Sequence, residues 1–234
     1  MSSPDQICLV TGASSGIGFA IAHSLLADGY LVVATARREA EMERLVGADI
    51  KAGDLTDPAF PDALEKHMIS GYGRCDFLFN CAGSIEAGTI EELDIDRMAA
   101  MLRINVEATF RLTYKILKRF RQQGSGHVIN ISSVLGTKVR PTAGAYAATK
   151  FAMEALSEAL RMELAGSDIK ISCIEPGLVQ THLHDHWKVH PRVGMGIHEP
   201  LGVDDIVATV RFIMKQPPHV RIPKVMVLPK DHVI

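Results

Sequence analysis

The stretch Thr11-Gly12-Ala13-Ser14-Ser15-Gly16-Ile17-Gly18 stands between a short apolar run, residues 7–11, and a segment of helical period, residues 19–27, that ends at Gly29. A short apolar run bounded by turn residues is typical of a buried strand, and the 3.6-residue period that follows predicts a helix. The glycine-rich stretch is therefore expected to be a turn that leaves a strand and begins a helix.

A turn of this composition suits an anionic ligand. Gly12 permits the tight turn, Gly16 lets the backbone approach a pyrophosphate, and Gly18 lets the helix and the strand pack closely. The start of the helix adds free N–H groups and the positive end of a dipole. Glycine turns also occur for packing alone, but the strand and helix on either side favour nucleotide binding. The residues expected to contact the nucleotide here are Gly12, Ser14, Ser15, Gly16, Ile17 and Gly18.

Short apolar runs recur along the chain and alternate with longer segments of helical period. Strands separated by helices pair in parallel, and such strands are continuously apolar because helices cover both faces of the sheet. No linker or internal repeat divides the chain. We therefore expect a single α/β domain, residues 1–234, with a doubly wound parallel sheet of about seven strands. The expected strands are residues 7–11, 31–36, 49–53 (the weakest), 76–80, 127–132, 170–175 and 225–228.

Two helices are expected to be unusually long, residues 94–123 and 145–165. Each is followed by the glycine that is common just past a helix C-terminus, Gly124 and Gly166. Their length suits an oligomer interface. The least regular segment is residues 180–201, which we expect to form a lid over a binding site, because long loops in compact domains are usually functional.

The residues after the second expected strand select the nucleotide. In NAD-type sites a carboxylate at this point, which falls on Ala36 or its neighbours, accepts hydrogen bonds from the adenosine ribose. Arg37 and Arg38 follow here instead. A guanidinium matches a 2′-phosphate dianion in geometry and charge, so NADP(H) is the expected cofactor. A solvated position at a helix start explains Arg38 more readily than Arg37.

The third expected strand ends at another candidate for cofactor binding. Asp54 and Leu55 are placed to contact the adenine, with the carboxylate on its amino group. A turn or helix-capping role before Thr56 explains Asp54 nearly as well.

Composition excludes several other classes of protein. The chain carries 25 Lys and Arg against 27 Asp and Glu, a net charge of −2, which favours a small-molecule partner over nucleic acid or a membrane surface. The N-terminus lacks the features of a signal peptide and no run approaches a membrane span, so a cytoplasmic protein is expected. The four cysteines are far apart and three lie in apolar runs, which indicates buried, reduced side chains.

At the reacting end, Tyr146 and Lys150 are four residues apart on an expected helix and so share a face. A phenol exchanges protons poorly at neutral pH until a neighbouring cation stabilises its anion, and we expect Lys150 to shift the pKa of Tyr146 toward working pH. Tyr146 is then the general acid in carbonyl reduction. Ser133, at the end of the fifth strand, can hold the substrate oxygen. An amphipathic helix pair and a turn cap are the alternatives for these residues.

Taken together, these motifs resemble the short-chain dehydrogenase/reductase family over essentially the whole chain. The motifs that carry the resemblance are Thr11 to Gly18, Asn80-Cys81-Ala82-Gly83, Asn105, Ser133, Tyr146-Ala147-Ala148-Thr149-Lys150 and Pro176-Gly177, in the family's order and spacing. Cys81 departs from the family's usual second asparagine. The C-terminal residues 223–234 lack the glycine-rich ending of many relatives and resemble a compact branch that includes 3-hydroxy-acid (serine-type) dehydrogenases.

The resemblance implies a Rossmann-type fold and further site residues. Asn105 corresponds to the asparagine that anchors a water in a proton relay from Lys150, and Lys150 also holds the nicotinamide ribose. Homodimers or homotetramers through the helices at 94–123 and 145–165 are usual in the family. The remaining residues that the resemblance assigns to the cofactor are Asn80, Ala82, Gly83, Pro176, Gly177, Val179 and Thr181.

The 180–201 segment is rich in histidine, with His182, His184, His186, His190 and His198. A metal cluster is disfavoured because a lid is poor at holding fixed ligand geometry. We expect these histidines to flank the substrate entrance, where their charge would favour an acidic substrate. Trp187 in the same segment either reports lid closure or anchors the loop.

The sequence therefore favours an NADPH-dependent oxidoreductase that acts on a small aldehyde, ketone or oxo acid, or on the matching secondary alcohol, without a metal. An alternative with the same nucleotide site is an NADPH-binding protein of weak turnover whose bound cofactor emits blue light, as some bacterial family members do. A metal hydrolase and a nucleic-acid or structural partner are disfavoured.

Overall fold

The computed structural model describes residues 6–185, 187 and 191–234. Their strands form a single seven-stranded parallel sheet in the order β3-β2-β1-β4-β5-β6-β7, which confirms the doubly wound α/β fold. The order reverses between β1 and β4, next to the glycine-rich turn. The strands are β1 (Ile7–Thr11), β2 (Leu31–Thr35), β3 (Asp49–Ile50), β4 (Phe77–Asn80), β5 (Ser125–Ile131), β6 (Asp168–Pro176) and β7 (Lys224–Val227).

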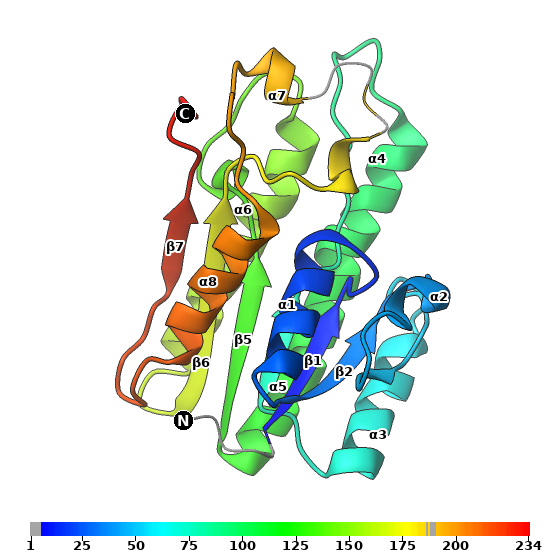
Figure 1. Ribbon diagram of the computed structural model, residues 1–234, viewed down its shortest axis with the longest axis vertical. Coiled ribbons are helices and arrows are strands. Elements are labelled where there is room, and N and C mark those ends of the chain that lie inside the picture. Colours follow the sequence, from blue (N-terminus) through cyan, green and yellow to red (C-terminus); the bar gives the residue numbers. More distant parts are fainter. Residues whose placement is uncertain (1–5, 186, 188–190) are drawn as a thin grey trace.

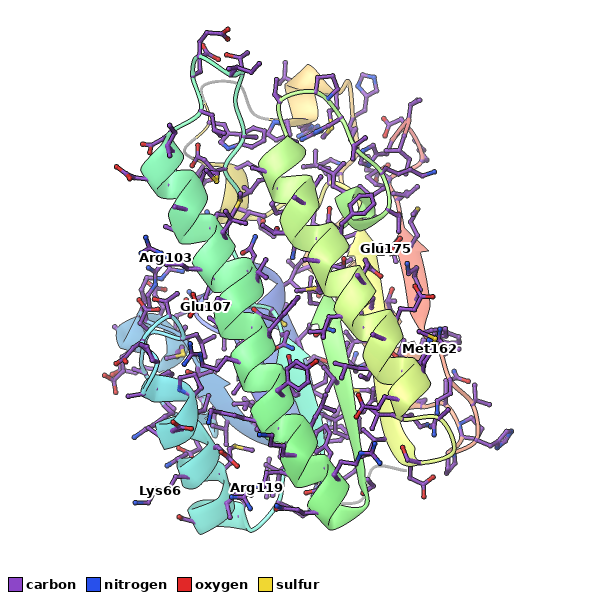
Figure 2. The ribbon with its side chains drawn as sticks, turned by 180° about the vertical axis from the view of Figure 1, so that it is seen from behind. Lys66, Arg103, Glu107, Arg119, Met162 and Glu175 are labelled. Carbon is purple, nitrogen blue, oxygen red and sulfur yellow. The ribbon has the colours of Figure 1, made fainter. Side chains whose placement is uncertain are left out.

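Helices cover both faces of this sheet. In Figure 1, α1 and α8 lie in front of the strands, and Figure 2 shows α3, α5 and α6 side by side on the opposite face. The helices are α1 (Gly16–Ala27), α2 (Glu39–Met42), α3 (Phe60–Tyr72), α4 (Ile95–Leu102), α5 (Thr109–Gln123), α6 (Gly144–Glu163), α7 (Pro191–Gly194) and α8 (Val203–Met214). Among the described residues, no helix has both the length and the apolar composition to cross a bilayer.

Two apolar cores explain why the strands are continuously hydrophobic. Val10 and Ile129 belong to the core under α1 and α8, whereas Leu9 and Val128 belong to the core under α3 and α5. Successive residues of a strand point to opposite faces, so each strand contributes to both cores. A sheet buried in this way is a rigid platform for the loops at its edges.

The long helix expected at residues 94–123 is not uniform. It runs as α4 and α5 joined by a π-helical turn, Arg103–Ala108, which the apolar period does not reveal. Thr109 donates a hydrogen bond of 2.9 Å from Oγ1 to the Ile104 carbonyl at this turn. Turns of this kind occur often at functional sites.

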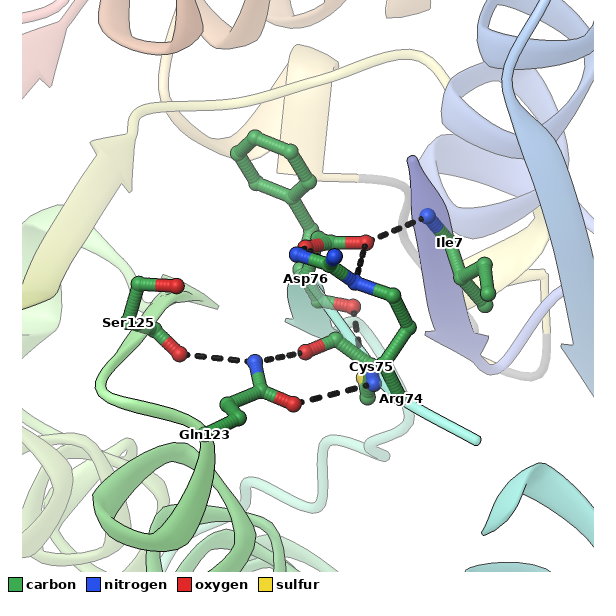
Figure 3. Close-up of polar contacts among 7 residues, drawn as sticks. Ile7, Arg74, Cys75, Asp76, Gln123 and Ser125 are labelled. Carbon is green, nitrogen blue, oxygen red and sulfur yellow. Dashed lines mark hydrogen bonds and ion pairs between the residues drawn. The ribbon is translucent and has the colours of Figure 1, made fainter. Parts of the chain in front are cut away.

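The amino ends of β1, β4 and β5 are tied together by polar side chains (Figure 3). Asp76 accepts a hydrogen bond of 2.9 Å from the Ile7 N–H and pairs with Arg74. Gln123 at the end of α5 donates to the carbonyls of Cys75 and Ser125. These contacts fix the register of the central strands at the edge opposite the site described next.

Candidate active site

A cleft of about 1270 Å³ lies at the carboxyl ends of the strands, where ligands of open α/β sheets bind. Its wall includes the glycine-rich turn, the loops after β2 to β6, part of α6 and the residues after β7. Every residue that the sequence predicts for the site lines this cleft, with the exception of Asn80 and Asn105. The prediction from sequence therefore converges on one region of the molecule.

The glycine-rich turn packs against the end of β4 too closely for side chains. A Cβ on Gly12, whose φ is +66°, would lie 2.8 Å from the Ala82 Cα, and a Cβ on Gly18 would lie 2.5 Å from the Gly12 carbonyl oxygen. Thr11 holds the same contact by accepting hydrogen bonds from the Cys81 and Ala82 N–H groups at 3.0 and 3.1 Å. These contacts leave a cradle of bare backbone beside the cleft.

The first turn of α1 offers N–H groups to this cradle. Ser15 occupies the N-cap position without a side-chain cap, and Gly16, Ile17 and Gly18 line the cleft. An uncapped helix start binds an anionic group through free N–H donors and the helix dipole. The residues present thus fit the pyrophosphate of a dinucleotide.

Two arginine side chains flank the cradle, and they differ in their contacts. Arg38 donates hydrogen bonds from Nη2 to Ser14 Oγ at 3.1 Å and to Ser15 Oγ at 2.8 Å. Arg37 lines the cleft close enough to Asp54 to lower the pKa of that carboxyl. The structure therefore places Arg38, which the sequence favours less, directly over the glycine-rich turn.

Asp54 itself forms a local turn. Its Oδ1 accepts hydrogen bonds from the Thr56 N–H at 2.9 Å and from Thr56 Oγ1 at 2.8 Å, and these bonds lower its pKa. The turn interpretation of Asp54 is thus realised, while Asp54 and Leu55 still line the cleft.

Asn80 points into the protein rather than into the cleft. Its Nδ2 donates to Thr113 Oγ1 at 2.9 Å and to Asn130 Oδ1 at 2.8 Å, so it joins β4 to α5 and β5. The residue is only 2% exposed. Ala82 and Gly83, by contrast, line the cleft. Of the motif that begins at the end of β4, Ala82 and Gly83 therefore line the cleft, whereas Asn80 is buried behind it.

The reacting end of the cleft brings Ser133, Tyr146 and Lys150 together. Lys150 Nζ lies 5.8 Å from the centroid of the Tyr146 ring and donates a hydrogen bond of 2.9 Å to the Ile131 carbonyl. Ser133 begins a 3₁₀ turn, where its Oγ accepts a hydrogen bond from the Leu135 N–H, and its hydroxyl lies close enough to the Tyr146 phenol to act on the pKa of that group. A proton donor, a cation and a hydroxyl thus share one wall.

The pKa of Tyr146 differs from the expectation. Burial raises it to about 12, while the Ser133 hydroxyl and the Arg140 guanidinium act to lower it. Burial also lowers the pKa of Lys150 to about 8. The expected shift of the phenol's pKa toward neutral pH is therefore wrong for the protein alone, because the loss of hydration outweighs the effects of Ser133 and Arg140.

Asn105 lies in the π-helical turn and is held by its neighbours. Its Nδ2 donates to the Ser84 carbonyl at 2.9 Å and to Thr149 Oγ1 at 3.1 Å, and its Oδ1 accepts from the Ser84 N–H at 2.9 Å. The side chain thus joins the loop after β4 to α6, where its partner Thr149 directly precedes Lys150. Its role in a proton relay stays a prediction.

The turn after β6 closes the cleft from the other side. Pro176, Gly177, Val179 and Thr181 all line it. The 180–201 segment is fastened at both ends, because the Gln180 N–H donates to the Leu201 carbonyl at 2.8 Å beside a parallel bridge between Val179 and Leu201.

The histidines of this segment do not converge where the structure describes them. His182 pairs with Asp185 at 2.8 Å on the surface, and His184 stacks edge-on against Trp187 with ring centroids 5.1 Å apart. His186 and His190 lie outside the described residues. Within the described residues no group of three or more His, Cys, Asp or Glu could hold a metal ion.

Sequence reasoning missed Arg140 and His232, which also line the reacting end. Arg140 lies between Ser133 and Tyr146 in the chain, and a cation between two expected catalytic residues could have been recognised as a candidate site residue. His232 comes from the residues after β7, and nothing in its local sequence indicates that it reaches the cleft.

A cleft of dinucleotide size, with an anion cradle at one end and a buried tyrosine, lysine and serine at the other, is the arrangement of a nicotinamide-dependent oxidoreductase. The chain belongs to the short-chain dehydrogenase family, whose model, described as "short chain dehydrogenase", matches residues 6–191. It is accordingly an oxidoreductase of that family.

Individual relatives are similar over nearly their full length. An uncharacterized oxidoreductase of Staphylococcus epidermidis is 30% identical over 230 residues, which cover 96% of this chain and 97% of the relative. The closed form of a serine dehydrogenase complexed with NADP+ has a TM-score of 0.88 and 25% identity, covering 95% of this chain and 94% of the other. A short-chain dehydrogenase from Streptomyces avermitilis has a TM-score of 0.85 and 32% identity, covering 97% and 89%.

Proposed function

We propose that this chain catalyses NADP(H)-dependent hydride transfer between the nicotinamide and a small carbonyl compound or the matching secondary alcohol. The observation that carries the proposal is the presence of Ser133, Tyr146 and Lys150 on one wall of the cleft that begins at the glycine-rich turn. The complex of the similar serine dehydrogenase with NADP+ supports the choice of nucleotide.

When bound, the reduced nicotinamide supplies the hydride. The Ser133 hydroxyl holds the carbonyl oxygen, and Tyr146 donates its proton to that oxygen as negative charge develops there. Lys150 stabilises the phenolate that remains and holds the nicotinamide ribose. The phenol is protonated at neutral pH, as the proton donor in a carbonyl reduction must be.

The preference for NADP(H) rests on the two arginines after β2. The three residues after this strand, at positions 36–38, include no carboxylate that could bind the ribose of NAD. Arg38 is already oriented over the cradle by its hydrogen bonds to the Ser14 and Ser15 hydroxyls. Either guanidinium is suited to a 2′-phosphate.

The same face that carries α4, α5 and α6 supports assembly into a homodimer or homotetramer. Leu102, Tyr114, Phe151 and Met162 on these helices are exposed, between 39% and 60% of each residue. Figure 2 shows the helices side by side, with Met162 labelled on α6. Exposed apolar side chains on neighbouring helices favour contact with a second copy.

The proposal is tested by titrating the protein with NADPH and NADH and then adding a panel of aldehydes and ketones to the same sample. We expect NADPH to bind at least ten times more tightly, and Arg37→Gln and Arg38→Gln variants to show which guanidinium is responsible. Tyr146→Phe is expected to lower turnover by a factor of about 10² to 10⁴ without weakening NADPH binding.

Three results would contradict the proposal. Tighter binding of NADH would remove the role of the arginines, and full activity of Tyr146→Phe would remove the general acid. Binding of NADPH with enhanced blue emission and no turnover of any carbonyl would favour the alternative of a cofactor-binding protein.

A further inference from the structure

The reacting end of the cleft holds a guanidinium that the chemistry above does not use. Arg140 is half-buried, lines the cleft, and lies close enough to Tyr146 and His232 to lower the pKa of both. Burial lowers the pKa of Arg140 itself, whereas the nearby Tyr146 raises it. A cation thus stands beside the reacting phenol at a position where hydration is reduced.

The partner of this guanidinium is a poor one. Arg140 donates from Nη1 to Met195 Sδ at 2.6 Å, and a thioether is a weak acceptor. Within the described part of the chain, no carboxylate lies within ion-pair distance of Arg140. Arg97, in the same cleft, is instead neutralised by Glu86 at 2.9 Å. The donors of Arg140 therefore match an anion that the protein itself does not supply.

The charged side chains along the cleft lead to the same conclusion. Among the described residues that line it, the acidic side chains are Asp54 and Glu86, whereas the lysines and arginines are Arg37, Arg38, Arg97, Arg103, Lys138, Arg140 and Lys150. The phosphates of a dinucleotide account for cations near the glycine-rich turn. They do not account for Arg140 at the opposite end, beside Tyr146.

The loop that carries Arg140 is fixed rather than free. Pro141 follows it, and Thr142 has φ +67°, a left-handed conformation that is strained for a β-branched residue. The Thr142 carbonyl accepts a hydrogen bond of 2.9 Å from the Gly88 N–H. The neighbouring loop therefore supports this backbone conformation next to Arg140.

We propose that Arg140 binds a carboxylate of the substrate, so that the carbonyl compounds reduced here are oxo acids. The planar fork of a guanidinium pairs with a carboxylate through two parallel hydrogen bonds, which would displace the Met195 thioether. The inference rests on the proposed reduction and names the class of substrate. From the sequence, the histidines of the 180–201 segment are expected to favour an acidic substrate, whereas this proposal assigns the carboxylate to Arg140.

The test compares ketones that carry a carboxylate with their uncharged methyl esters. With saturating NADPH, kcat/KM is measured for pyruvate, acetoacetate and 4-oxopentanoate and for their methyl esters, so that three spacings between carbonyl and carboxylate are covered. For at least one pair we expect the acid to exceed its ester by about 10-fold or more. Arg140→Gln should lower kcat/KM of that acid by about 10- to 100-fold and reduce the ratio toward one.

The acid-to-ester ratio isolates the contact. Arg140 also acts on the pKa of Tyr146, but the same phenol serves both members of a pair, so this effect cancels. Arg140→Lys keeps the charge without the fork and should give an intermediate ratio. Lys66→Gln removes an equal charge from the exposed face of α3, labelled in Figure 2, and should leave the ratio unchanged.

A ratio near or below one for all three wild-type pairs would overturn the proposal, as would a ratio that Arg140→Gln leaves intact. If no ketone is reduced, the proposed function fails, and the carboxylate site is judged by calorimetric titration of the NADP+-loaded protein with succinate. Binding by the wild type that Arg140→Gln abolishes would support the site, and absence of binding by the wild type would overturn it.

Discussion

Replacing Lys224 with methionine should destabilise the protein by an amount that depends on pH. Lys224 Nζ pairs with Glu154 at 3.0 Å and with Glu175 at 3.1 Å, and both carboxylate side chains are nearly buried, 9% and 0% exposed. Breaking a buried pair costs about 3–5 kcal/mol because a charge remains without compensation. Since the Lys224 side chain is 45% exposed and water screens the pair, we expect about 2–3 kcal/mol at pH 7.5.

The pH dependence follows from Glu175. Burial raises its pKa above the ordinary value of 4.5, so the folded protein holds this proton more tightly than the unfolded chain. Protonation of Glu175 therefore favours folding as the pH falls toward 4.5. Without the Lys224 ammonium the pKa of Glu175 rises further. At pH 5 a proton on Glu175 should then compensate for most of the positive charge that the substitution removes. The destabilisation should then shrink to about 1 kcal/mol.

Urea unfolding of the wild type and Lys224→Met at pH 7.5 and pH 5 measures both quantities. Lys66→Met, which removes an exposed lysine from α3, should change the free energy of unfolding by less than about 0.5 kcal/mol at either pH. A Lys224→Met/Glu154→Gln double variant should be less destabilised than the sum of its parts, because the excess negative charge is gone. Equal destabilisation at both pH values would refute this account of the cluster.

Two further predictions concern the cradle and the sheet. Gly18→Ala places a Cβ 2.5 Å from the Gly12 carbonyl oxygen and should weaken NADPH binding at least about 10-fold, as measured by fluorescence titration. Gly29→Ala is the control, because Gly29 has φ +84° but open space around it. This variant should lower the free energy of unfolding by about 1 kcal/mol and leave the NADPH affinity unchanged. Burial lowers the pKa of His127 to about 3. Below pH 6.5 the unfolded chain therefore binds a proton at this residue that the folded chain does not bind. The free energy of unfolding should accordingly fall by up to about 1.4 kcal/mol per pH unit below pH 6.5. Denaturation of His127→Gln between pH 7 and pH 4 should show a shallower decline, and an unchanged slope would assign the acid sensitivity to other groups.

Local patterns predicted the sheet and the cradle well. The run 7–11 and the glycine-rich turn lie within a few residues of each other, so their chemistry is visible in a short window, and β1 (Ile7–Thr11) matches the expected strand. The spacing of Tyr146 and Lys150 likewise placed both on α6 and in the cleft.

Contacts between distant residues could not be predicted in this way. Asn80 faces Thr113 and Asn130, and Arg38 reaches back to Ser14, because the packed sheet and helices decide where each side chain points. The raised pKa of Tyr146 has the same origin, since it depends on how completely the fold excludes water from the phenol. Sequence spacing shows which residues are neighbours along a helix but not how dry their surroundings are.

The bridge between Val179 and Leu201 has a consequence for how such a protein can diversify. The bridge keeps the two ends of the intervening segment adjacent, whatever its length or composition. Insertions or exchanges within it change what covers the cleft without displacing β6 or α8 on either side. What covers this part of the cleft can therefore vary while Ser133, Arg140 and Tyr146, which lie outside the segment, keep their places.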